Sequence, residues 1–233
     1  MLDNAPHAWK LNEAFLSMWN PEALSHDWVL PDNFHVHVKV TDMVTERVHF
    51  MNEPVDVSYK VNRPSESGRS IGANTVHSID GMIVREITRM AEYGGKKYHF
   101  INMIQNQTKK FSEPSKKLGV LLDHYNRSGY LSSRVLAYIN EGNVHLVPEE
   151  PLMEIINNLP NKAFTVVSVH DCFKVLPNYG NDIRKLYNYQ LYKLAATDLL
   201  SYLISQIMGT PIIYENNDPS MAQDILDADY ALS

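Results

Sequence analysis

The sequence predicts a mixed α+β fold, in which an antiparallel hairpin packs on helices and a small helix-and-hairpin region precedes it. Three patterns support this prediction. Residues 34–40 and 55–61 alternate between apolar and polar side chains, as half-buried strands do. Residues 165–175 form a β-branched run, Thr-Val-Val-Ser-Val-His-Asp-Cys-Phe-Lys-Val, which is typical of a buried strand. Residues 181–208 carry an apolar stripe at helical spacing.

Composition and charge narrow the class of protein. The chain has 233 residues, enough for one large or two small domains with a hydrophobic core. No apolar run approaches the roughly eighteen residues of a membrane span. The single cysteine, Cys172, excludes an internal disulfide and indicates a reducing compartment. The net charge of -6 argues against a free-standing nucleic-acid binder, which usually has an excess of basic residues. We therefore expect a cytoplasmic protein with no membrane partner.

Residues 1–62 are predicted to form the helix-and-hairpin region. Residues 5–20 place large apolar side chains at mostly helical spacing, which predicts an amphipathic helix. In residues 34–40 the valines lie on one face of the predicted strand, with His35 and His37 on the other. Two histidines so spaced can bind a metal, but no third ligand is evident nearby, so a solvated strand face is favoured.

A polar stretch containing Gly and Pro, residues 63–73, is predicted to be a mobile loop before a C-terminal domain, residues 74–233. Residues 96–160 are predicted to be a helical insertion in that domain. Lysine pairs with aromatic residues between them recur in this segment, a mixture that can contact nucleic acid. Each cluster is only a pair, so a solvated insertion is favoured.

The first helix of the C-terminal domain is expected to begin with Asn74 as its cap and to run to about Tyr93, before two glycines. His77 and Asp80 are three residues apart, so they share one face of this helix near its N-terminus. Helix N-termini attract phosphate groups. The alternative is that both residues are only capping groups.

The last part of the chain is predicted to be mostly helical. Residues 181–208 are expected to form one long helix, ended by Gly209, that packs under the hairpin. Asp218 is expected to begin a short final helix, followed by a tail at residues 227–233.

Asp171 lies in the middle of the β-branched run and needs an explanation. A carboxylate in a buried strand must be paired, hydrogen-bonded or bound to metal, because burying it alone is costly. One interpretation is a capped or ion-paired aspartate at the bend of a hairpin. The other is a carboxylate at the crest of a hairpin that binds a divalent metal for phosphoryl chemistry.

Three segments bear on this choice. The sequence Ser-Val-His-Asp-Cys-Phe at residues 168–173 resembles the palm motif of single-subunit DNA-directed RNA polymerases, the bacteriophage and mitochondrial type. Asn-Thr-Val-His-Ser-Ile-Asp-Gly at residues 74–81 is similar to the family's segment upstream of that hairpin, and residues 224–233 resemble its C-terminal tail. The three matches occur in the family's order, so the resemblance covers most of residues 74–233 and implies a palm-like segment.

The resemblance implies a role for the His-Asp pair in two-metal nucleotidyl transfer. In that chemistry two carboxylates from different segments bind a pair of Mg²⁺ ions about 3.5 to 4 Å apart. Asp171 matches one of the family's two metal-binding aspartates. His170 precedes it as in the family and is expected to position the RNA primer end, which makes both residues catalytic.

The resemblance also implies binding roles outside the hairpin. His77 is expected to face the template or the nascent base pair, with Asp80 supporting it. Tyr230 and Ser233 are expected to contribute through the C-terminal tail. The implied substrates are ribonucleoside triphosphates, the implied template is DNA and the implied product is RNA.

Two elements of the family pattern do not occur in the sequence. These are the Asp-Gly-x-x-x-Gly element with the first metal aspartate, and the helix with a substrate lysine followed by Tyr-Gly; Asp80 and Gly81 belong to the histidine motif instead. In family order both elements precede residue 1. We therefore expect a second chain to carry the other aspartate, the fingers and the thumb. The chain is then the smaller half of a split phage polymerase, acting in the cytoplasm of the bacterial host, or a piece of a longer polymerase.

Two other functions compete with this interpretation. In metal-dependent phosphohydrolases of the His-Asp type, His77, His170, Asp171 and Asp198 would gather a metal ion, but the His-Asp pair of such enzymes lies on a helix. In a non-catalytic scaffold derived from a polymerase palm, the chain would only bind a partner.

Overall fold

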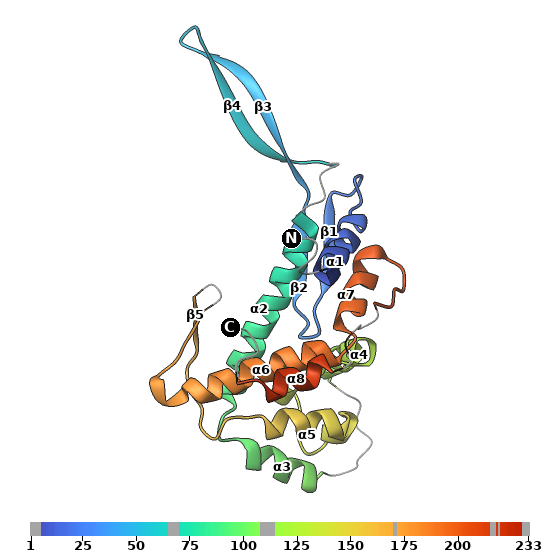
Figure 1. Ribbon diagram of the computed structural model, residues 1–233, viewed down its shortest axis with the longest axis vertical. Helices are drawn as coiled ribbons and strands as arrows, with labels where there is room; N and C mark the ends of the chain where they lie inside the picture. The colour runs from blue at the N-terminus through green and yellow to red at the C-terminus, as the bar shows by residue number, and fades with distance from the viewer. Residues whose placement is uncertain are drawn as a thin grey trace.

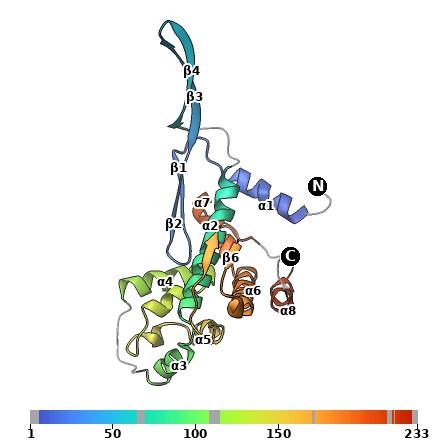
Figure 2. The same ribbon diagram turned by 90° about the vertical axis from the view of Figure 1, so that its left-hand side faces the viewer.

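A computed structural model describes residues 6–64, 70–107, 115–169, 172–214, 218 and 220–229. The predicted α+β class is confirmed, because helices predominate and the strands pair as antiparallel hairpins. Figures 1 and 2 show one long helix, α2 (Ser70–Glu92), through the middle of the molecule. A hairpin projects beyond one end of α2, and short helices gather around its other end. None of the described helices combines the length and apolar composition that a membrane span requires.

The other elements follow one another along the chain. Those before α2 are α1 (Pro6–Ser17), β1 (Ser25–Val29), β2 (His35–Lys39), β3 (Thr41–Phe50) and β4 (Glu53–Asn62). Those up to the predicted His-Asp hairpin are α3 (Lys97–Gln105), α4 (Lys116–Ser128), η2 (Ser133–Ala137), η3 (Val144–Leu146) and α5 (Glu149–Asn157). The remaining elements are β5 (Val167–Val169), β6 (Cys172–Lys174), η4 (Pro177–Tyr179), α6 (Gly180–Ala196), α7 (Leu199–Met208) and α8 (Met221–Asp227).

The N-terminal region contains two hairpins. The predicted strands at residues 34–40 and 55–61 are confirmed as β2 and β4, and each pairs with the strand that precedes it. The β1–β2 hairpin packs on the body of the molecule through the buried Trp28. The β3–β4 hairpin turns at Met51 and Asn52, whose positive φ angles of 49° and 67° suit the tight turns that join twisted antiparallel strands.

Helix α2 begins earlier than predicted. Its first residue is Ser70, so Asn74 is not its cap; the Asn74 side chain donates a hydrogen bond to the Ser70 carbonyl, at 2.8 Å. The predicted loop is therefore wrong for residues 70–73, and residues 65–69 lie outside the described residues. The predicted end is correct, because α2 ends at Glu92 and Gly95 follows with a positive φ of 77°.

The segment 96–160 is helical, but the prediction that it is solvated is wrong. Its helices α3, α4 and α5 lie near the C-terminal end of α2 and contribute apolar side chains to the core that α2 shares (Figure 1). The lysine pairs obscured this packing, because Lys116 and Lys117 are exposed whereas Leu118 and Leu121 on the same helix are buried. The apolar residues of this segment in the main core are Phe100, Leu118, Leu121, Leu131, Val135, Leu136, Ile139, Val144, Val147, Leu152, Ile155, Ile156 and Leu159.

Two predictions for the C-terminal part were wrong. The run 165–175 is not a buried strand but two three-residue strands, and Val167 and Val169 are 52% and 45% exposed. The single long helix is broken at Thr197, whose extended backbone (φ -124°, ψ 163°) separates α6 from α7. The break lets the two helices pack in different places, since α6 contributes to the main core and α7 packs on Trp28.

Helix α2 joins the three apolar clusters of the described residues. Its first turn contributes Ile71 to a small cluster with α1 and α7, and Met82 belongs to the cluster around Trp28. Further along, Ile83 and Ile87 lie in the main core. Every cluster therefore depends on where α2 lies.

The burial of α5 makes a testable prediction. Replacing Ile156, which is 0% exposed, with alanine leaves a cavity in the main core. The free energy of unfolding should fall by roughly 2–5 kcal/mol. Tyr98→Ala is the control within the same segment, because Tyr98 is 76% exposed and its loss should change stability little. Chemical denaturation of both variants measures the difference, and equal small effects would show that the segment is not part of the core.

Candidate functional site

The predicted catalytic pair lies between two strands that form a hairpin. The strands β5 and β6 pair antiparallel, and the last pair of the ladder joins Val169 to Cys172. His170 and Asp171 are the two residues between them and lie outside the described residues, as do Tyr230 and Ser233. The hairpin is the shape predicted for this segment, although its strands are more exposed than predicted.

Aromatic contacts attach this hairpin to the helix that follows it. The ring of Phe173 lies 5.7 Å from that of Tyr187 on α6, measured between centroids. Just before and after the hairpin, Phe164 stacks on Tyr179 at 4.6 Å. These contacts place α6 against the hairpin, as the sequence predicted.

His77 and Asp80 lie on α2, with Ile79 between them in the sequence. Ile79 packs against the same main core as Phe173 of the hairpin, so one core supports both predicted parts of the site. His77 is exposed and Asp80 is half-buried. Among the residues that the structure describes, neither has a hydrogen-bond or ion-pair partner.

The position of this pair along α2 corrects two expectations. His77 lies about two turns after Ser70, the first residue of the helix. Neither His77 nor Asp80 is a capping group, because capping involves only the ends of a helix. Attraction of phosphate by the N-terminus of the helix does not reach them either, since that effect fades within the first turn.

The described residues do not form a metal site by themselves. Among them, no three His, Cys, Asp or Glu side chains are grouped so as to bind a metal ion. His37 pairs instead with Asp27, whose Oδ1 lies 2.5 Å from His37 Nδ1, and both side chains are exposed. Mg²⁺ prefers oxygen ligands and is usually bound by one or two carboxylates.

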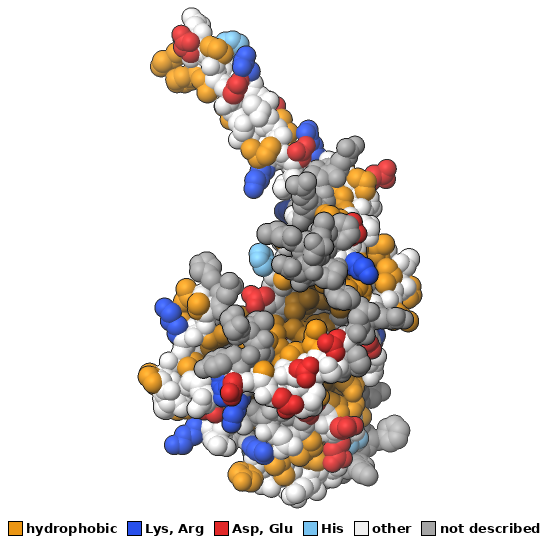
Figure 3. All heavy atoms as spheres, in the orientation of Figure 1, with side chains coloured by type: hydrophobic (Ala, Val, Ile, Leu, Met, Phe, Trp, Pro, Cys, Tyr) orange, Lys and Arg blue, Asp and Glu red, His pale blue; other side chains and the backbone are white. Residues whose placement is uncertain are grey.

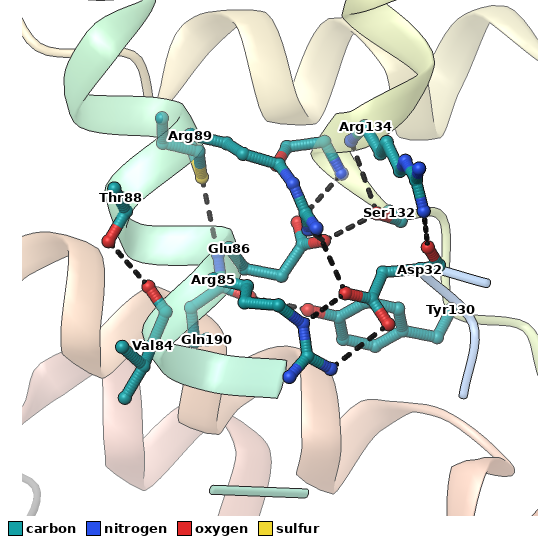
Figure 4. A network of polar contacts seen from close by, with 12 residues as sticks. Asp32, Val84, Arg85, Glu86, Thr88, Arg89, Tyr130, Ser132, Arg134 and Gln190 are labelled. Atoms are coloured by element: carbon teal, nitrogen blue, oxygen red, sulfur yellow. Dashed lines mark hydrogen bonds and ion pairs between the residues drawn. The ribbon is translucent and has the colours of Figure 1, made fainter. Parts of the chain in front are cut away.

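The most buried charges in the described structure were not predicted from the sequence. Asp32 follows β1 and is completely buried between two arginines of α2 (Figure 4). Arg85 Nε donates to Asp32 Oδ2 at 2.6 Å, and Arg89 Nη2 lies 3.0 Å from the same oxygen. Arg134 of η2 donates to the Asp32 carbonyl oxygen at 2.6 Å. Asp32 thus joins its own segment to α2 through its carboxylate and to η2 through its backbone carbonyl.

Glu86 is the second completely buried carboxylate of this network. Arg89 Nη1 donates to its Oε1 at 2.7 Å, and the backbone N–H of Ser133 donates to its Oε2 at 2.7 Å. The Ser132 hydroxyl also donates to Oε1. These bonds satisfy the carboxylate and hold η2 against α2.

The pKa of Asp32 shows that the arginines outweigh the cost of burial. Burial by itself raises the pKa of this carboxyl, but the hydrogen bonds and positive charges of Arg85 and Arg89 lower it below its usual value. Asp32 is therefore ionised at neutral pH. Since every charge in the network has a partner, its role is to fix α2 in place rather than to perform chemistry.

Lys193 of α6 extends this buried region. Its Nζ donates to the Leu131 carbonyl at 2.5 Å and lies 3.9 Å from the centre of the Tyr130 ring. Burial lowers the pKa of Lys193 to about 8, although the negative charges of Glu86 and Glu154 act to raise it. The amine is enclosed by protein, which makes it a packing group rather than a nucleophile.

One local signal could have revealed the network. Arg85, Glu86 and Arg89 interrupt the apolar stripe of α2 between buried residues. Charges inside such a stripe are rarely buried unless they are paired. The identity of the partner, Asp32, could not be read from this pattern.

The structure also bears on the phosphohydrolase alternative. Strands flank His170 and Asp171, whereas that alternative requires a helix. Asp198 is exposed at the start of α7, beside a groove lined by α7 and the residues after it. We do not adopt this alternative.

Comparison with known proteins does not assign the chain to a family. No protein-family model matches the chain, and no curated protein matches its sequence. The residues themselves must support any proposal.

Removing the carboxylate of Asp32 tests the role of the network. Asp32→Asn leaves the positive charges of Arg85 and Arg89 partly buried without their partner, and breaking a buried pair costs about 3–5 kcal/mol. Thermal or chemical unfolding measures this loss. Asp56→Asn is the control, because it breaks an exposed Asp-Arg pair on β4 and should change little.

The pH dependence of stability should show whether Asp32 stabilises the fold through its charge or through packing. The pKa of Asp32 is lower in the folded than in the unfolded chain, so its stabilisation is present above 3.8 and is lost as the pH falls through the lower, folded value. The Asp32→Asn variant should lack this part of the acid-induced loss. An unchanged acid dependence would contradict the assignment.

Proposed function

We propose that this chain is the C-terminal palm part of a DNA-directed RNA polymerase of the single-subunit type. It contributes one metal-binding aspartate, Asp171, to the transfer of nucleotides from ribonucleoside triphosphates to the 3′ end of RNA. A second chain contributes the other aspartate, the fingers, the thumb and the helix that binds the triphosphate. The proposed place of action is the cytoplasm of a bacterial host.

The observation that carries the proposal is the hairpin around the His-Asp pair. Residues on both sides of His170 and Asp171 form antiparallel strands, and Phe173 fixes them to α6. A two-stranded hairpin with strands this short is not stable alone in water. Its exposed strands, with Val167 and Val169 turned partly to solvent, fit a small sheet that another chain extends.

The second support is the placement of the upstream motif. His77 and Asp80 lie on α2, and the core that holds α2 also holds the hairpin. Their lack of partners among the described residues fits groups that contact a template or a nascent base pair.

The reaction divides between the two chains. When bound, paired Mg²⁺ ions activate the RNA 3′ hydroxyl and stabilise the pyrophosphate that leaves. Asp171 supplies one carboxylate ligand, and His170 positions the primer end. His77 contacts the template or nascent pair with the support of Asp80. Cations for the triphosphate come from the second chain, so the isolated chain synthesises no RNA.

A non-catalytic scaffold is the second candidate function. One observation favours it: the buried charges of the network are all engaged in structural pairs, and the described residues contain no metal cluster. In a scaffold, Asp171 is dispensable for the activity of the assembled complex. The two functions therefore predict different activities for a complex in which the carboxylate of Asp171 has been removed.

Asp171→Asn in the assembled complex tests the proposal. The chain is tagged in its natural source and purified with its partners at low salt. RNA synthesis is measured with Mg²⁺, ribonucleoside triphosphates and a DNA template. The variant should lose several orders of magnitude in rate, because one metal ligand is removed. Asp123→Asn, at an exposed carboxylate of α4, is the control and should retain activity.

Two results would overturn the proposal. Full activity of the Asp171→Asn complex would show a scaffold, and RNA synthesis by the isolated chain would show that no second chain is needed.

A further inference from the structure

The β3–β4 hairpin has no cover from the described parts of the chain. Each of its strands has ten residues, and both views show it projecting away from the other elements (Figures 1 and 2). Every residue from Thr45 to Lys60 is exposed. An isolated two-stranded hairpin is at best marginally stable in water, because it has no core to bury an apolar face. The length of this hairpin therefore calls for a surface that it packs against.

The register divides the hairpin into two unlike faces. Cross-strand partners lie on the same face and successive residues alternate between faces. One face is polar: Arg47 pairs with Asp56 at 2.8 Å, and Thr45 hydrogen-bonds Ser58 at 2.9 Å. We call the opposite face the apolar face; its cross-strand pairs are Asp42 with Val61, Val44 with Tyr59, Glu46 with Val57, Val48 with Val55 and Phe50 with Glu53.

The charges on the apolar face are all negative. It carries carboxylates but no Lys, Arg or His, because the cations of the two strands, Arg47 and Lys60, lie on the polar face. Arg63, just beyond β4, pairs with Asp42 at the base. Towards the tip, Glu46 accepts a hydrogen bond from Tyr59 at 2.6 Å, and Glu53 lies opposite Phe50. Figure 3 shows apolar side chains along the projecting hairpin.

We propose that the apolar face binds a second protein chain, through a surface on that chain that combines apolar side chains with lysine or arginine. The inference rests on the proposed function in that we identify this partner with the second polymerase chain. Burial of Val48, Val55 and Val57 supplies the hydrophobic contact. Glu46 and Glu53 supply the complementary charge.

The same charges argue against other occupants. Nucleic acid is disfavoured, because its phosphates would meet carboxylates, and the cation at the base of this face, Arg63, is already paired with Asp42. A second copy of the chain is disfavoured as well, because two apolar faces packed together would bring Glu46 and Glu53 of one copy against those of the other. Neither objection applies to a basic surface on another protein.

The base of the β3–β4 hairpin is attached to the rest of the molecule, as the base of a docking element should be. Val40, the residue before β3, is buried, and its backbone N–H donates to the Leu24 carbonyl at 2.9 Å. The next helix after β4 is α2, which carries His77 and Asp80. A partner held on the hairpin is therefore tied to the helix of the proposed site.

The test compares two lysine substitutions on neighbouring residues. Val57→Lys removes an apolar side chain from the apolar face and places a positive charge there; Glu46 lies opposite, so a cross-strand ion pair keeps the hairpin intact. Ser58→Lys makes the same change of charge on the polar face and is the control. Affinity is measured between each purified variant and the second chain obtained from the natural complex. Circular dichroism checks that both variants fold.

We expect Val57→Lys to weaken binding about tenfold or more, as for a contact residue of an interface, and Ser58→Lys to leave it unchanged. Equal affinities for the second chain in both variants would overturn the inference and leave the proposed function standing. Purification of no second chain would overturn the proposed function, and the inference with it. A loss of DNA binding or of self-association by Val57→Lys, with affinity for the second chain intact, would also overturn the inference.

Discussion

The buried ion pairs between Asp32 and the arginines of α2 determine how the rest of the molecule is arranged. Arg85 and Arg89 reach Asp32, and Glu86 reaches the start of η2, so two other segments of the chain are fixed to this one helix. Neither buried carboxylate is tolerable without its partners, because an unpaired buried charge is strongly destabilising. The network therefore specifies the position and rotation of α2, and the three apolar clusters fill in around it.

Two hairpins near α2 are exposed among the described residues. At one end α2 follows the β3–β4 hairpin, whose apolar face has no cover among the described residues. Beside the main core lies the short β5–β6 hairpin with its exposed strands. Both hairpins are too small to be stable sheets alone. A single second chain that covers one and extends the other would account for both, and the proposed role of Asp171 calls for such a chain.

Local patterns in the sequence predicted much of the fold. Alternation identified β2 and β4, and the glycine pair after α2 marked its end. Long-range features could not be predicted: Asp32 and Arg85 are separated by 53 positions, and no local pattern links them. The run around Asp171 misled because a β-branched sequence fits a buried strand and an exposed hairpin equally well. For the candidate site, the sequence indicated the hairpin and the helix that flanks it. The network of buried charges around Asp32 and Glu86 became visible only in three dimensions.

The central claim is that Asp171 is one ligand of a metal site shared by two chains. Replacing Mg²⁺ with Fe²⁺ in the purified complex tests it directly, because hydroxyl radicals formed at bound iron cleave only nearby backbone. The account predicts cuts in this chain beside His170 and Asp171 and cuts in the second chain at its own carboxylate motif. Excess Mg²⁺ should suppress both sets, and Asp171→Asn should weaken both. Cuts confined to the second chain and unaffected by Asp171→Asn would contradict the claim.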